Sequence, residues 1–104
     1  MGNRLELHEV LKTLLPEPHK KNLYFQPPEN LKMSYPCIIY KWSRPKQYYA
    51  NNDPYNRIKS YTVTVVDSDP ESGIAEKVSQ QRATSFERAY TSNNLNHFVF
   101  NLYF

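Results

Sequence analysis

One stretch of the chain, residues 35–71, limits the folds that the chain can adopt. It contains two β-forming segments, a long polar and aromatic connection between them, and the start of a helix. Its most regular part is residues 61–66, which read YTVTVV. β-Branched and aromatic residues favour strands, and the period of two places Tyr61, Val63 and Val65 on one face. The pattern predicts a strand with one face in the core and the other in water or against a partner.

The same stretch begins with another strand and ends with the start of a helix. Residues 35–42 are rich in β-forming residues, and the run CIIY at residues 37–40 lacks alternation, which is typical of a strand inside a sheet. Asp69, Pro70 and Glu71 follow the second strand in the order that opens a helix. We expect Asp69 to be the N-cap and Pro70 the first helical residue.

The flanking segments complete a small α+β pattern. A leucine-rich stripe predicts an amphipathic helix over residues 4–15. Further strands are expected at residues 22–26, 55–66, 83–90 and 96–104. We expect Phe86, Arg88 and Tyr90 on one side of their strand, and Phe98, Phe100, Leu102 and Phe104 on one face of the last. This order predicts a mainly antiparallel sheet of about four to five strands, with both helices packed on one face.

Composition excludes several classes of function. The 104 residues form one expected domain, and two Gly leave no glycine-rich phosphate loop. A single cysteine and three separated histidines give no zinc-type spacing, so neither a metal nor a cofactor is expected. No apolar run reaches the roughly 18 residues of a membrane span. The net charge of +3 is modest and its basic residues are scattered, which is typical of solvated surface.

Two groups of reactive side chains are better explained by structure than by chemistry. Asp67, Asp69 and Glu71 alternate as the oxygen ligands of a hard cation can, but they lack the glycine and the closing glutamate of a calcium loop. We interpret them as helix-capping residues. Cys37 lies in an apolar strand, where a buried and unreactive thiol is expected. No catalytic residues are predicted.

The connection that follows the strand of residues 35–42 carries the candidate binding residues. Residues 43–54 are too long and polar for a tight hairpin and mix cations with aromatic rings, as protein contact surfaces do. The predicted partner contacts are Arg44, Lys46, Tyr48, Tyr49 and Tyr55. Single-stranded nucleic acid is bound by the same mixture, so a small basic nucleic-acid-binding module using residues 43–56 is the alternative. A third class, a small hydrolase or inhibitor-like domain, has no positive mark in the sequence.

Three segments carry a resemblance to a known family. They are residues 25–40 (FQPPENLKMSYPCIIY), residues 61–70 (YTVTVVDSDP) and residues 90–97 (YTSNNLNH). Together with the order of helices and strands, they resemble tailed-phage tail terminator proteins, also called tail completion or head–tail joining proteins, of which the phage lambda tail terminator is the type case. The resemblance covers most of the chain and lies in fold and composition, with no catalytic signature.

The resemblance implies a structural role in the virion. Members of this family form a ring, usually a hexamer, that caps the tail tube and docks onto the head connector. It implies no enzymatic activity and no cofactor, a location in the tail or neck of the virion, and assembly in the host cytoplasm. A ring can pair the exposed edges of neighbouring sheets, and Tyr-rich surfaces suit such contacts.

The predicted role of residues 43–54 is tested by replacing their paired tyrosines. Tyr48→Ala combined with Tyr49→Ala is expected to weaken association between copies or with the tube, because it removes two amphipathic rings from the contact. The monomer should stay folded. Light scattering measures the assembly and circular dichroism checks the fold; unchanged assembly would contradict the assignment.

Overall fold

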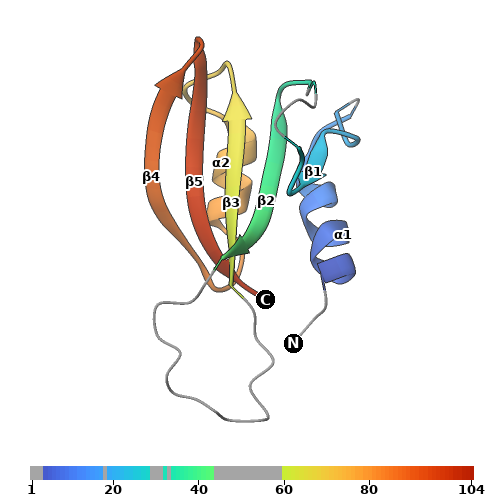
Figure 1. Cartoon of the computed structure of the whole chain (residues 1–104). Helices are drawn as coiled ribbons and strands as arrows, with labels where there is room; N and C mark the ends of the chain where they lie inside the picture. The colour runs from blue at the N-terminus through green and yellow to red at the C-terminus, as the bar shows by residue number, and fades with distance from the viewer. Residues whose placement is uncertain (1–3, 18, 29–31, 33, 44–59) are drawn as a thin grey trace, which may run out of the picture.

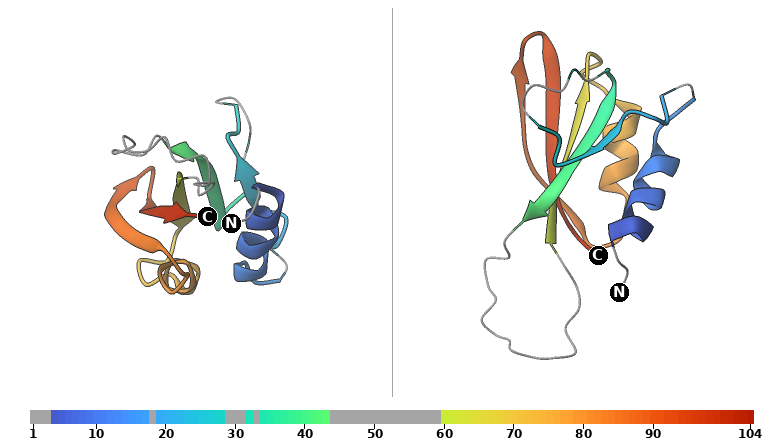
Figure 2. Two further views of the ribbon diagram at one scale, coloured as in Figure 1. Left: turned by 90° about the horizontal axis from the view of Figure 1, so that it is seen from below. Right: turned by 45° about the vertical axis from the view of Figure 1, so that its right-hand side comes forward.

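The computed structural model describes residues 4–17, 19–28, 32, 34–43 and 60–104. Its elements in chain order are α1 (Arg4–Leu14), β1 (Leu23–Phe25), β2 (Cys37–Ser43), β3 (Ser60–Asp67), α2 (Gly73–Ser79), β4 (Thr84–Ser92) and β5 (Leu95–Tyr103). The strands form a five-stranded sheet, and both helices lie on the same face of it (Figure 1, Figure 2). The predicted α+β class is confirmed.

The sheet has the strand order β1-β2-β3-β5-β4. β1 runs parallel to β2, whereas the remaining neighbours pair antiparallel, so the expectation of a mainly antiparallel sheet is also confirmed. β3 is the middle strand. Because β5 folds back between β3 and β4, β4 becomes the outer strand of the sheet.

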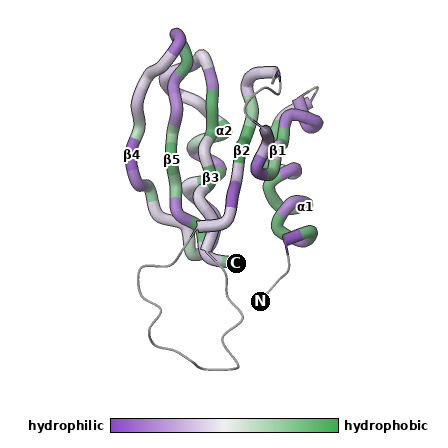
Figure 3. Tube along the Cα trace, viewed as in Figure 1, coloured by the Kyte–Doolittle hydropathy of each residue, from purple (hydrophilic) through white to green (hydrophobic). Residues whose placement is uncertain are grey.

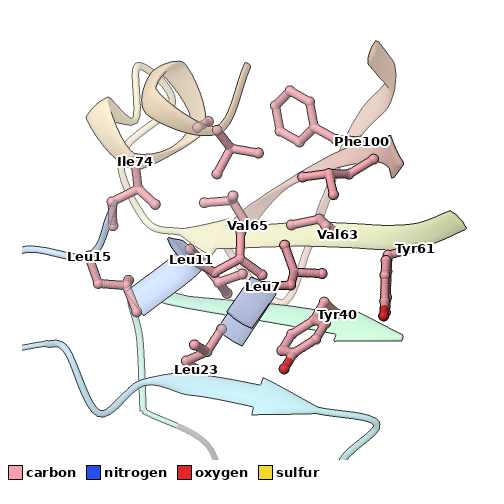
Figure 4. Close-up of a cluster of buried hydrophobic side chains, with 14 residues drawn as sticks. Leu7, Leu11, Leu15, Leu23, Tyr40, Tyr61, Val63, Val65, Ile74 and Phe100 are labelled. Atoms are coloured by element: carbon pink, nitrogen blue, oxygen red, sulfur yellow. The ribbon is translucent and has the colours of Figure 1, made fainter. Parts of the chain in front are cut away.

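The core lies between the helices and the central strand. Leu7 and Leu11 of α1 have no exposed surface, as predicted from the leucine stripe. Figure 4 shows them among Val63 and Val65 of β3, and Figure 3 shows hydrophobic and hydrophilic segments together on α1. Tyr61, Val63 and Val65 are all 0% exposed, which confirms the face predicted to be core. On the last strand, Phe98, Phe100, Leu102 and Phe104 all pack in or against this core, again as predicted.

The start of α2 corrects one prediction. Its N-cap is Ser72, whose Oγ accepts a hydrogen bond from the N–H of Ala75 at 3.2 Å. Asp69 caps no helix: its Oδ1 accepts from the N–H of Glu71 at 2.9 Å and closes a local turn. Asp67 closes the preceding turn in the same way and accepts from the Ser72 hydroxyl at 2.8 Å. An aspartate side chain can stabilise a turn as well as cap a helix. For this reason the helix was predicted to begin too early, at Asp69 instead of Ser72.

A second prediction, that Phe86, Arg88 and Tyr90 lie on one side of their strand, is wrong. A β-bulge between Phe86 and Arg88 shifts the register against β5, so that Phe86 lies opposite Phe100 whereas Arg88 lies opposite Val99. Phe86 therefore shares the helix-covered face of the sheet, while Arg88 and Tyr90 lie on the other face. A strict period of two predicts one common side, and a single inserted residue breaks that period.

The β4–β5 hairpin closes through a two-residue turn. Asn93 and Asn94 have φ values of 53° and 64°. Positive φ at both central positions matches the twist of the flanking strands, and asparagine tolerates this region better than most residues. The two strands are longer at this end than the predicted residues 83–90 and 96–104, because β4 extends to Ser92 and β5 begins at Leu95. Of the long strand predicted at residues 55–66, the structure describes the part that begins at Ser60.

The contribution of the core contact is tested on α1. Leu11→Ala should lower the free energy of unfolding by about 2–5 kcal/mol, because it leaves a cavity beneath a fully buried side chain. Leu5→Ala on the same helix is the matched control, since Leu5 is 64% exposed, and it should change stability by less than about 0.5 kcal/mol. Urea unfolding followed by circular dichroism measures both. Equal losses would contradict the packing described here.

Candidate assembly surface

The outer strand β4 is the largest exposed edge of the sheet. It is nine residues long, and every residue after Thr84 is exposed. The opposite edge strand, β1, has only three residues. In the part of the chain that the structure describes, no strand pairs with the outer side of β4. A row of free backbone N–H and C=O groups of this length is a template for pairing with another chain.

Two aromatic side chains of β4 are exposed yet held in place by β5. Phe86 is 58% exposed and contacts Phe100 edge to face, with ring centroids 5.6 Å apart. Tyr90 is 44% exposed and stacks on His97, with centroids 4.6 Å apart and an interplanar angle of 11°. Rings that are already fixed lose little conformational freedom on binding, so both are suited to a protein contact.

The bulge places an acid and a base side by side in the middle of this edge. Glu87 Oε1 accepts a hydrogen bond from Asn101 Nδ2 at 2.9 Å, which holds the carboxylate on the face away from the helices. Arg88 lies 3.4 Å from the other Glu87 oxygen, and its guanidinium lies 5.6 Å from the centre of the Tyr90 ring. Both side chains are exposed, so their ion pair adds little to stability and remains free to exchange partners.

A second group of aromatic side chains lies where β2 ends and β3 begins. Trp42 stacks on Tyr61 with ring centroids 4.8 Å apart, and Phe25 of β1 meets Trp42 edge to face at 6.4 Å. Trp42 is 44% exposed and immediately precedes Ser43. Neither Trp42 nor the two exposed aromatics of β4, Phe86 and Tyr90, was predicted as a contact residue from the sequence. For Trp42, an aromatic residue at the end of an otherwise apolar strand was the available signal.

The hydroxyl of Tyr40 lies at the centre of a small polar network. It is 2.7 Å from His8 Nδ1 and accepts a longer hydrogen bond, 3.4 Å, from Arg4. The Arg4 guanidinium also lies 4.4 Å from the centre of the Phe25 ring. Burial, assisted by the charge of Arg4, lowers the pKa of His8, whereas burial raises the pKa of Tyr40. Both groups are therefore neutral near pH 7.

The hydroxyl of Tyr61, unlike that of Tyr40, has no hydrogen-bond partner among the described residues. Its oxygen is buried and makes no hydrogen bond in the part of the chain that the structure describes. Burial, and secondarily Tyr40, raises the pKa of Tyr61. Figure 4 shows the two hydroxyl groups at the same side of the core. A buried polar group without a partner costs roughly 1–3 kcal/mol, so Tyr61 stabilises the fold through its ring, which packs on Trp42, and not through its hydroxyl.

The contact residues predicted from sequence lie outside the described residues. These are Arg44, Lys46, Tyr48, Tyr49 and Tyr55. The structure places the two ends of their segment, because Ser43 pairs directly with Ser60.

The side chains considered for catalysis or metal binding have structural roles. Cys37 is fully buried, and its pKa is raised to about 12 by burial and by Asp67, so it stays a thiol at neutral pH. Asp67 and Asp69 are engaged in the turns before α2. Among the described residues, no group of His, Cys, Asp or Glu side chains could hold a metal ion.

Comparison with known proteins adds no relative. No protein-family model, curated protein or solved structure matches the chain. Within the described ranges, no helix has the length and apolar character needed to cross a membrane. Function is therefore inferred from the residues and geometry of the chain itself.

The two buried tyrosines give a matched test of the polar network. Tyr61→Phe should raise the free energy of unfolding by about 1 kcal/mol, because it removes an unpartnered buried hydroxyl and keeps the ring. Tyr40→Phe should lower it by about 1 kcal/mol, because His8 and Arg4 lose their partner. Urea titration at neutral pH measures both, and changes of the same sign would contradict the assignment.

Proposed function

We propose that this protein is a structural protein of a phage virion, which caps the tail tube as an oligomeric ring and joins the tube to the head connector. The proposal combines the resemblance of residues 25–40, 61–70 and 90–97 to tail terminator proteins with the geometry of the sheet. A ring of this kind acts through its surfaces alone. It stops growth of the tube at one end and presents its other end to the connector.

The observation that carries the proposal is the exposed outer strand β4. A nine-residue edge with almost every residue exposed promotes uncontrolled pairing unless a specific partner covers it. A closed ring supplies such a partner to each copy, because the edge of one subunit meets a different surface of the next. An assembly protein therefore has a use for an edge that a monomeric protein would have to protect.

The side chains on this edge favour a protein partner. Phe86 and Tyr90 are exposed, and each is fixed against a ring of β5. Aromatic residues are enriched at the centres of protein interfaces, where they bury a large area. Trp42 of β2 adds a third exposed ring, and it is close in sequence to the predicted contacts, which begin at Arg44.

Capping of tail tubes tests this function directly. Tube protein of the phage that encodes the chain is polymerised with and without the purified protein, and tubes are examined by electron microscopy. The protein should form ring-shaped caps and limit tube length. Phe86→Lys combined with Tyr90→Lys should reduce the fraction of capped tubes at least tenfold, because removing two interface aromatics costs more than about 1.4 kcal/mol.

The matched control is Leu5→Lys, which changes an exposed apolar residue on α1, at the opposite side of the sheet from β4 (Figure 1). It should cap tubes as the unchanged protein does. Tubes of unaltered length without caps would contradict the proposal. Binding to single-stranded DNA that weakens steeply as salt rises would instead favour the nucleic-acid-binding alternative, since such binding releases counterions.

A further inference from the structure

The charge pattern of β4 is complementary to itself. Glu87 and Arg88 are adjacent near the middle of the strand, and both are exposed. When two copies of a strand run antiparallel about a two-fold axis, each residue meets its mirror position in the other copy. With the axis between these two residues, each Glu87 faces Arg88 of the second copy, so two ion pairs form together.

The β-bulge makes this register consistent on both faces of the sheet. Because of the bulge, Glu87 and Arg88 lie on the face away from the helices, and Phe86 and Ala89 lie on the helix-covered face. In the two-fold register the two bulges face each other. Each residue of one copy then lies opposite a residue of the other copy that is on the same face of the sheet, and every residue has an opposite. A regular strand paired with β4 would instead leave one residue of the bulge without an opposite.

The sizes of the remaining side chains fit the same register. Phe86, which is 58% exposed, comes to lie opposite the small Ala89 of the second copy. Tyr90 comes to lie opposite Ser85, and Thr84 opposite Thr91. Large residues thus meet small ones without a clash, and the Thr84–Thr91 pair is of a kind that stabilises neighbouring strands.

We propose that the free protein pairs β4 with β4 of a second copy, in the antiparallel register that sets Glu87 against Arg88. Resting on the assembly role proposed above, this dimer covers the edge that the ring would use. It is therefore a resting form: the edge is protected from uncontrolled pairing until the dimer opens on the tube. A ring contact must compete with the dimer for the same backbone groups.

Charge reversal at the two central residues tests the dimer. In Glu87→Arg, the new arginine of each copy faces Arg88 of the other copy, which gives two arginine–arginine pairs. In Arg88→Glu, the new glutamate of each copy faces Glu87 of the other, which gives two glutamate–glutamate pairs. Each variant alone should have a dissociation constant at least tenfold higher than the unchanged protein, because like charges opposite one another are unfavourable. An equimolar mixture should form a one-to-one heterodimer, since every arginine then meets a glutamate. Analytical ultracentrifugation gives the constants and native mass spectrometry the composition.

The double change Glu87→Arg with Arg88→Glu is the second variant. It keeps the charge of the strand, should self-associate within about threefold of the unchanged protein, and serves if a single variant fails to fold. Glu76→Arg and Lys77→Glu are matched controls, because they alter an adjacent acid and base on the exposed side of α2 and should leave the dissociation constant unchanged.

Two outcomes would overturn the dimer: an unchanged protein that is monomeric at every accessible concentration, or a mixture of the two single variants that associates no better than either alone. Tube capping is measured separately. A monomer that caps tubes removes the dimer and leaves the assembly role standing. A dimer with the expected charge dependence that never binds tubes supports the pairing of β4 and removes the assembly role.

Discussion

The packing of the two helices on one face of β3 is the contact on which the rest of the structure depends. Tyr61, Val63 and Val65 are fully buried in the middle strand, and Leu7 and Leu11 of α1 belong to the same buried cluster. Burying an aliphatic or aromatic side chain stabilises by about 1.5–3 kcal/mol, so this face supplies much of the folding free energy. Both helices lie on this one face, and among the described residues no strand pairs with the outer side of β4.

This asymmetry connects the fold with the proposed assembly. β5 is inserted between β3 and β4, which leaves β4 outermost in the sheet. The bulge in β4 then gathers Glu87 and Arg88 at one place on the exposed edge. The same edge can pair with a second copy in the free protein and with a neighbour in a ring, so competition between the two pairings would time assembly.

Sequence patterns predicted the elements well and the details at their junctions poorly. The strand of residues 61–66 and the leucine stripe of residues 4–15 were found because their periods are strong. The N-cap of α2 was placed at Asp69 instead of Ser72, since both residue types cap helices and the choice depends on the turn that Asp67 forms. Phe86, Tyr90 and Trp42 were not predicted as contact residues, because their exposure depends on the place of β4 and of the end of β2 in the sheet.

The sequence by itself determined the α+β class, the order of the elements and the buried face of β3, because hydrophobic periodicity is encoded within each segment. Only the tertiary structure decided that β4 is the edge strand, that a bulge separates Phe86 from Arg88, and that among the described residues the Tyr61 hydroxyl has no partner while that of Tyr40 has two. Each of these depends on which distant residues become neighbours, and local periodicity carries no record of that pairing.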